Sequence, residues 1–155
     1  APNGAAVSGG PDWGAPPPVR VSSPPTLTAL PAGFDAAAFE RIAKMIFIRM
    51  QTANDSADLD DLRQFTTPDM FANVRLALQE RGDVAQSTDV ARVDAEVLDV
   101  TTEADRQMVS VRFHGLIRED AHASPAPFDE IWHLVRPLDG SREWAIAGIQ
   151  QSMTA

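Results

Sequence analysis

The most regular pattern of apolar and polar residues in the chain begins at Phe34 and has the period of an α-helix. Apolar residues recur there at steps of three and four, which places them along one side of a helix. Asp35 stands at the start, where an aspartate side chain caps a first turn well. The positions predicted to face the core are Phe39, Ile42, Ala43, Ile46, Met50 and Ala53.

This first helix is apolar on more than one side. At about 100° per residue, Ile48 falls opposite the predicted core stripe, between Arg41 and Lys44, while Met45 and Phe47 lie on the two flanks. One interpretation is a helix enclosed between a sheet and neighbouring helices. The other is a surface with a basic rim that contacts a partner protein or lipid.

Two shorter helices are predicted next. The first runs from Asp58 to about Gln64. The second begins at Thr67-Pro68-Asp69, which combines a capping threonine, a proline in the first turn and an acid, and it stops at Gly82. All three helices therefore precede the strands.

Four strands are predicted in the second half of the chain. Residues 91–98 and 108–118 alternate between apolar and polar side chains, as expected of strands with one face in water. In residues 128–151 both alternating sets are apolar, which favours central strands covered on both sides. Asp139 and Gly140 give a turn signal between them, so the last two strands form a hairpin. Helices first and an antiparallel meander afterwards define an α+β domain.

Composition narrows the class of protein. The 155 residues are 44% hydrophobic, which suits one domain with an ordinary core, and none is cysteine. The formal charge of −9 argues against a nucleic-acid partner. No run reaches the roughly 20 apolar residues of a membrane-spanning helix. Residues 1–33 hold most of the prolines and only two charged side chains, so they are predicted to be a linker or arm, and residues 34–155 a folded domain.

Candidate metal ligands are sparse. Four carboxylates crowd between Asn54 and Asp61, but this segment lacks the glycine and glutamate of a helix-loop-helix calcium site, so a helix N-terminus is the better interpretation. His114, His122 and His133 have no ligand spacing. No metal site and no cofactor are therefore predicted.

Two acid/base sets need to be considered in a sheet of this kind. They are Asp129 with His133, and Asp94 with Glu96. The chain has no tyrosine, which removes the phenol donor that a ketosteroid-isomerase-like site would use. We therefore expect no catalytic residues and a protein that is not an enzyme.

The sequence resembles a known family along most of its folded part. The pattern Glu130-x-Trp132-x-Leu134-x-Arg136, followed by Trp144-Ala-Ile-Ala-Gly-Ile149-Gln150, is similar to the C-terminal domain of the forty-four-kilodalton subunit of the mitochondrial inner-membrane import translocase and its bacterial relatives. Phe65-Thr-Thr-Pro-Asp-Met-Phe71 and Gly115-Leu-Ile-Arg-Glu119 also look like this family. The resemblance implies the cone-shaped fold of nuclear transport factor two, in which a curved four-stranded antiparallel sheet wraps a long first helix around a cavity.

The same resemblance implies a function. It is that of a non-enzymatic protein-binding or scaffold domain, in a bacterial protein tethered to the inner membrane through segments outside this sequence, with a role in protein transport. The expected partner is a protein at that membrane, while the membrane face and the oligomeric state stay open. The alternative is a pocket that binds lipid or another apolar small molecule. The predicted contact residues are Arg41, Lys44 and Ile48 on the first helix, with Trp132, Leu134, Trp144 and Ile146 around the cavity.

Overall fold

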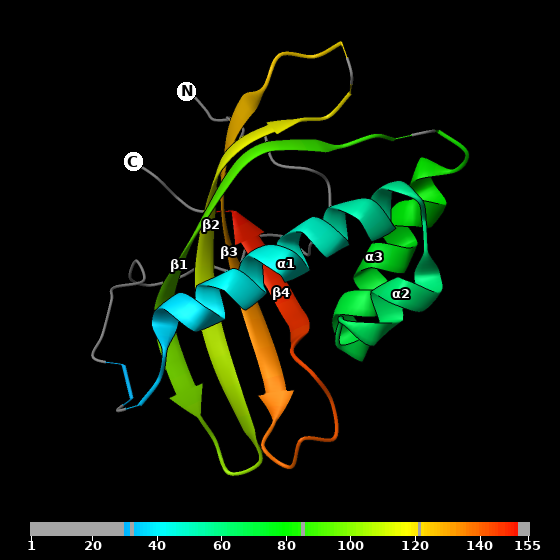
Figure 1. Ribbon diagram of the computed structural model, residues 1–155. Helices are drawn as coiled ribbons and strands as arrows, with labels where there is room; N and C mark the ends of the chain where they lie inside the picture. Colours follow the sequence, from blue (N-terminus) through cyan, green and yellow to red (C-terminus); the bar gives the residue numbers. More distant parts are fainter. Residues whose placement is uncertain (1–29, 32, 85, 121, 152–155) are drawn as a thin grey trace, which may run out of the picture.

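Three helices precede a four-stranded sheet in the computed structural model, as the sequence predicts (Figure 1). The structure describes residues 30, 31, 33–84, 86–120 and 122–151. The predicted linker, residues 1–33, lies almost wholly outside these residues. The elements are α1 (Ala36–Asp55), α2 (Leu59–Gln64), α3 (Pro68–Arg81), β1 (Asp89–Thr102), β2 (Arg106–Arg118), β3 (Ala126–Pro137) and β4 (Ala145–Gln151).

The helix ends follow their local sequence signals. The Asp35 side chain accepts a hydrogen bond from the Ala38 N–H at 3.0 Å and caps α1. Asp58 caps α2 in the same way, through the N–H of Asp61. Thr67 caps α3, and Gly82 ends it with a φ of 66°, which glycine adopts without strain. The three predicted helix starts and the predicted stop at Gly82 are confirmed.

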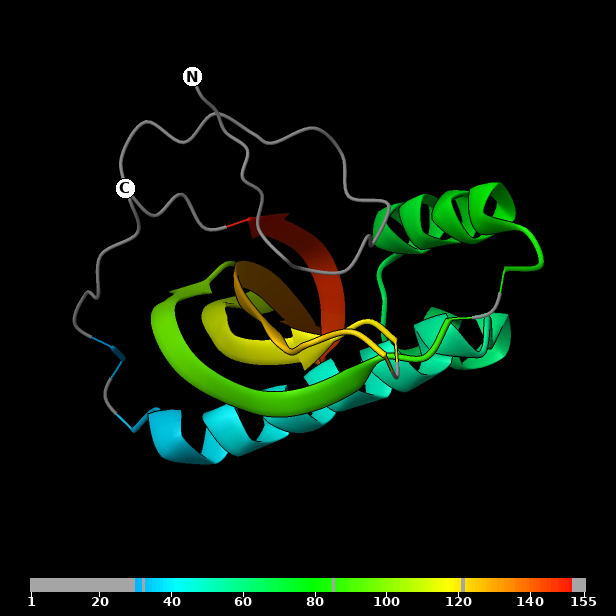
Figure 2. The same cartoon turned by 90° about the horizontal axis from the view of Figure 1, so that it is seen from above.

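The strands form an antiparallel meander in the order β1-β2-β3-β4, and the sheet is open (Figure 2). The pairing of β2 with β3 runs without interruption from Arg106 opposite Pro137 to Ile117 opposite Ala126. The other two pairings carry irregularities, two in β1 and one between β3 and β4. The predicted α+β class, with three helices before a four-stranded antiparallel sheet, is confirmed.

Two irregularities interrupt the alternation of side chains near the core. One lies between Val97 and Asp99, where Val97 belongs to the core cluster and Leu98 is also buried, although strict alternation predicted Leu98 on the wet face. Another shifts the register from Trp132 opposite Ile149 to Leu134 opposite Ile146. Ile146 and Ile149 therefore both belong to the core, and the prediction that they face opposite sides is wrong.

The β4 strand was predicted to be central, but it lies at an edge of the sheet. A meander leaves its last strand with one strand neighbour. The other edge of β4 is partly covered by the connection between α2 and α3, where the Thr67 N–H donates to the Ile146 carbonyl and the Ile146 N–H donates to the Phe65 carbonyl. These two bonds attach the α2–α3 unit to the sheet.

Helix α1 lies across the sheet and supplies the centre of the core (Figures 1 and 2). The Phe47 ring centroid is 4.8 Å from that of Phe113, 5.3 Å from that of Phe128 and 5.0 Å from that of Trp132. Phe47 was predicted to lie on a flank and Ile42 in the core. The structure reverses them, because the aromatic side chains of β2 and β3 take Phe47 into the centre and leave Ile42 43% exposed.

Candidate functional site

The seven predicted contact residues fall into two separate groups. Trp132, Leu134, Trp144 and Ile146 belong to the hydrophobic core. Arg41, Lys44 and Ile48 lie on the side of α1 that turns away from the sheet, where Arg41 and Ile48 are exposed and Lys44 is half-buried. The structure therefore brings together the residues within each group, but it does not join the two groups into one site.

The four residues of the core group do not line an open hollow. Trp132, Leu134 and Ile146 are fully buried, and the Trp132 ring packs on Phe47 and edge-on against Phe113 at 5.0 Å. Trp144 meets the Phe39 ring edge-on at 4.8 Å. Side chains of α1 fill the space at these positions, because the helix carries large aromatic residues on its buried side.

The pattern Glu130-x-Trp132 has a structural explanation in the same core. Residues two apart on a strand point to the same face, and both of these side chains are fully buried. The Trp132 indole N–H donates to the Glu130 carboxyl at 2.9 Å, and the Gln151 amide donates to its other oxygen at 3.3 Å. The pattern thus supplies an acceptor for a buried indole, as buried polar groups require.

The outward side of α1 carries three large apolar side chains that are exposed. Met45 is 72% exposed, and Ile42 and Ile48 are each 43% exposed. No described element covers this side in either view (Figures 1 and 2). We call Arg41, Ile42, Lys44, Met45 and Ile48 the α1 outer face. Sequence reasoning missed Ile42 and Met45 as members of it, although the three-residue steps from Ile42 to Met45 to Ile48 are visible in the sequence.

The α1 outer face is basic, although the whole chain is acidic. Its only charged members are Arg41 and Lys44, and neither forms a hydrogen bond or ion pair with a described residue. The nearby carboxylate Glu40 turns toward the sheet, where it accepts from the Val97 N–H at 3.1 Å. The α1 outer face therefore has two positive charges and three exposed apolar side chains, although the whole chain has a formal charge of −9.

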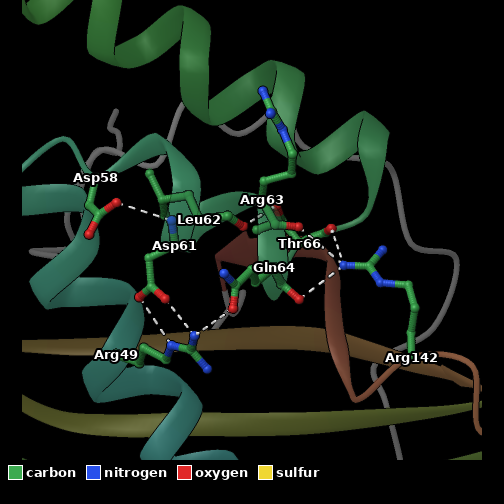
Figure 3. Close-up of polar contacts among 8 residues, drawn as sticks. All are labelled: Arg49, Asp58, Asp61, Leu62, Arg63, Gln64, Thr66 and Arg142. Carbon is green, nitrogen blue, oxygen red and sulfur yellow. Dashed lines mark hydrogen bonds and ion pairs between the residues drawn. The ribbon is translucent and has the colours of Figure 1, made fainter.

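Arg49, the third cation of α1, is held by α2 (Figure 3). Its Nε donates to Asp61 Oδ2 at 3.1 Å and its second terminal nitrogen to Asp61 Oδ1 at 2.5 Å. The guanidinium also lies 4.7 Å from the Phe65 ring centroid. The two hydrogen bonds from Arg49 lower the pKa of Asp61, and the Asp61 carboxylate raises the pKa of Arg49. Arg49 therefore forms a structural ion pair with Asp61 and is not part of the α1 outer face.

The C-terminal end of α2 is closed by an arginine from the connection between β3 and β4. One terminal nitrogen of Arg142 donates to the carbonyls of Arg63, Gln64 and Thr66 at 3.2, 3.0 and 3.3 Å (Figure 3). A cation at a helix C-terminus is favourable because the last carbonyls lack partners within the helix. This contact fixes α2 to the sheet.

A polar pocket of about 250 Å³ lies where α1 and α3 end. Its lining residues are Asn54, Ala77, Leu78, Glu80, Arg81 and Gln86. Arg81 donates to the Asn54 and Asp55 carbonyls at 3.0 and 3.2 Å. Charged and amide side chains surround this pocket, so it is unsuited to an apolar ligand.

The carboxylates between Asn54 and Asp61 serve different structural contacts. Asp55 accepts from the Gln86 amide at 2.9 Å and from the Thr88 hydroxyl at 2.8 Å. Asp58 caps α2, and Asp61 pairs with Arg49. Among the residues that the structure describes, no group of three His, Asp or Glu side chains is arranged to hold a metal ion.

The first possible acid/base set is divided between two structural contacts. Asp129 receives two hydrogen bonds from Arg112, at 2.9 and 2.6 Å, and it raises the pKa of that arginine. His133 instead bonds Ser110 through Nδ1 at 2.9 Å and Gln150 through Nε2 at 3.0 Å. Asp129 and His133 are therefore not paired with each other.

The second set is divided in a similar way. Asp94 accepts from Arg92 at 2.9 Å, and Glu96 lies 3.9 Å from Arg112. Each of these carboxylates is thus paired with an arginine on the surface of the sheet.

Comparison with solved structures finds similar chains at low sequence identity. The intermembrane space region of the chloroplast protein ARC6 matches with a TM-score of 0.50 and 14% identity, covering 78% of this chain and 98% of that chain. A nuclear transport factor 2-like superfamily protein from Salmonella enterica serovar Typhimurium has a TM-score of 0.44 and 10% identity over 77% of this chain and 93% of that chain. A ketosteroid isomerase-like protein from Erwinia carotovora atroseptica has a TM-score of 0.41 and 18% identity over 75% and 96%. The likeness to ARC6 shows a shared fold.

The sequence comparison is more specific. No curated protein matches the chain. The family described as the Tim44-like domain matches residues 23–151, which include every helix and strand of the structure. This match spans most of the sequence and agrees with the resemblance around Trp132 and Trp144. The chain therefore belongs to the Tim44-like domain family.

Proposed function

We propose that this domain is a non-enzymatic scaffold that binds another protein at a membrane, and that the full protein is held at a bacterial inner membrane. Membership of the Tim44-like family supports a membrane-associated scaffold. Among the residues that the structure describes, no helix combines the length and apolar character needed to cross a membrane. Any tether would consequently be sought outside these elements.

The single observation that carries the proposal is that α1 has apolar residues on two sides but is buried on only one of them. One side of the helix fixes it to the core through Phe39, Ala43 and Phe47. The other side exposes Ile42, Met45 and Ile48 in one continuous row. A contiguous apolar patch with polar residues at its rim marks an interaction surface, and a rigid helix presents that surface without a further cost of ordering.

The alternatives find less support in the side chains. The residues of both acid/base sets hold arginine, serine or glutamine partners instead of converging on a pocket. The four residues that would have lined an apolar ligand site, Trp132, Leu134, Trp144 and Ile146, are buried in the hydrophobic core. Binding through the outside of the domain is therefore the better proposal.

The test is quantitative purification of partners from detergent-solubilised membranes with the full-length protein as bait. Ile48→Asp places a charge in the centre of the α1 outer face. Leu76→Asp is the matched control, because Leu76 is 54% exposed on a different helix, α3. We expect Ile48→Asp to reduce recovery of the specific partner about tenfold, which corresponds to about 1.4 kcal/mol, and Leu76→Asp to leave it unchanged.

Folding is checked on the same variants by thermal unfolding. Both substituted side chains are exposed, so each variant should unfold within about 1 kcal/mol of the unchanged protein. Full recovery of all partners with Ile48→Asp, or after deletion of residues 34–151, would contradict the proposed function.

A further inference from the structure

The charge distribution on α1 indicates which kind of partner fits the α1 outer face. The helix contains the chain's only lysine, Lys44, together with Arg41 and Arg49. Arg49 is neutralised by Asp61, and the Glu40 carboxylate is bonded to the Val97 backbone. The positive charge left on the α1 outer face is therefore that of Arg41 and Lys44.

The apolar members of the face have a spacing that suits a helix. Ile42, Met45 and Ile48 lie three residues apart and span about 9 Å along the α1 axis. A partner helix would meet such a row with apolar anchors at three- and four-residue steps. Acidic residues beside those anchors would then face Arg41 and Lys44.

Two other occupants fit less well. In a symmetric pair of copies the same face meets itself, which would bring Arg41 and Lys44 close to their equivalents. A helix that lies in a lipid surface presents a broad apolar side with many cations. Here Phe39, Ala43 and Phe47 are buried in the core, so the exposed apolar side of α1 is narrow, and the α1 outer face carries two cations, Arg41 and Lys44.

The geometry points to an amphipathic, acidic helix of a partner protein as the occupant of the α1 outer face. This inference rests on the proposed function and names the chemistry of its partner. The apolar residues of that helix pack on Ile42, Met45 and Ile48, and its carboxylates face Arg41 and Lys44.

The single lysine allows a direct test. Zero-length carbodiimide treatment of the full-length protein in native membranes joins an amine to a carboxylate that it contacts. We expect mass spectrometry to find Lys44 joined to an Asp or Glu in an amphipathic segment of another protein. Lys44→Arg removes the reactive amine, so loss of the same product in this variant identifies the residue that was joined.

A charge exchange then tests the recognition itself. The joined segment is synthesised as a peptide, and its binding to the full-length protein is measured by calorimetry. Arg41→Glu with Lys44→Glu should weaken binding at least about tenfold. A peptide with its acidic residues replaced by lysine should regain binding to the doubly reversed protein, which a merely unfolded variant would not show.

The outcomes separate this inference from the proposed function. If Ile48→Asp removes the partner but charge reversal leaves peptide affinity unchanged, the acidic-helix inference fails and the scaffold survives. If Lys44 is joined only to another copy of this chain, the face is an interface between copies and the inference fails. It also fails if Lys44 is joined to no protein, while phosphatidylglycerol vesicles bind the protein and the double reversal abolishes that binding.

Discussion

The Glu40 side chain on α1 accepts a hydrogen bond from the Val97 backbone N–H at 3.1 Å, where β1 departs from regular pairing. Val97 is buried, so its N–H needs a partner inside the protein. The helix carboxylate therefore completes the irregular strand.

Glu40→Ala should lower the free energy of unfolding by about 1–3 kcal/mol, because it leaves a buried N–H without an acceptor. Chemical denaturation measures this change, and amide exchange at Val97 should become faster. Glu40→Gln retains an acceptor oxygen and serves as the control. Equal losses in both variants would show that the charge, and not the acceptor, is what matters.

A second irregularity of β1 depends on Gly115. A Cβ atom at Gly115 would lie 2.0 Å from the Arg92 carbonyl oxygen, which is far inside contact distance. Gly115→Ala should therefore destabilise the protein by about 1–3 kcal/mol or more, as the two strands are forced apart. Gly148→Ala is the matched control, since its Cβ would meet only His133 Cδ2 at an ordinary 3.8 Å. Thermal unfolding of the two variants should differ clearly, and equal midpoints would contradict this account.

The Arg49–Asp61 pair should make stability depend on pH. The pKa of Asp61 is lowered in the folded protein, so its contribution is fully present above the unfolded pKa of about 3.9 and is lost as pH falls through the lower folded value. Because the pair is partly exposed, Asp61→Asn should cost only about 0.5–1 kcal/mol near neutral pH. Denaturation of both proteins across the acid range should show this difference shrinking toward zero. A difference that stays constant with pH would assign the cost to packing.

Arg142 should control the attachment of α2. Arg142→Ala removes the donor for three carbonyls at the end of the helix, with an expected loss of about 1–2 kcal/mol. Hydrogen exchange should rise in α2 more than in β2. Arg75→Ala provides the control, because Arg75 is exposed on α3. Uniformly faster exchange throughout the sheet would contradict a local role.

The features that sequence predicted correctly depend on short-range signals. Asp35, Thr67 and Gly82 mark helix ends through their own side chains or backbone freedom, without help from distant residues. The order of helices and strands followed from periodicity. The family resemblance followed from short sequence patterns at residues 65–71, 115–119 and 130–150.

The errors arose where a distant partner decides the outcome. Because α1 is apolar on more than one side, its pattern does not decide between Phe47 and Ile42 as the buried residue, and the aromatic rings of β2 and β3 settle that Phe47 points inward. Alternation also contains no sign of the irregularity between β3 and β4 that places Ile146 and Ile149 together in the core. In the candidate site, the sequence pattern placed Arg41, Lys44 and Ile48 on the outward side of α1. It assigned Ile42 to the core, although this side chain is exposed.

Because α1 precedes every strand, it is synthesised before the sheet that buries its inner side. Until β2 and β3 have been made, the side chains of Phe47 and Met50 are exposed as well as those of Ile42 and Met45. The helix segment then has exposed apolar side chains on both of its sides. Apolar surface exposed in this way favours aggregation until the sheet has formed.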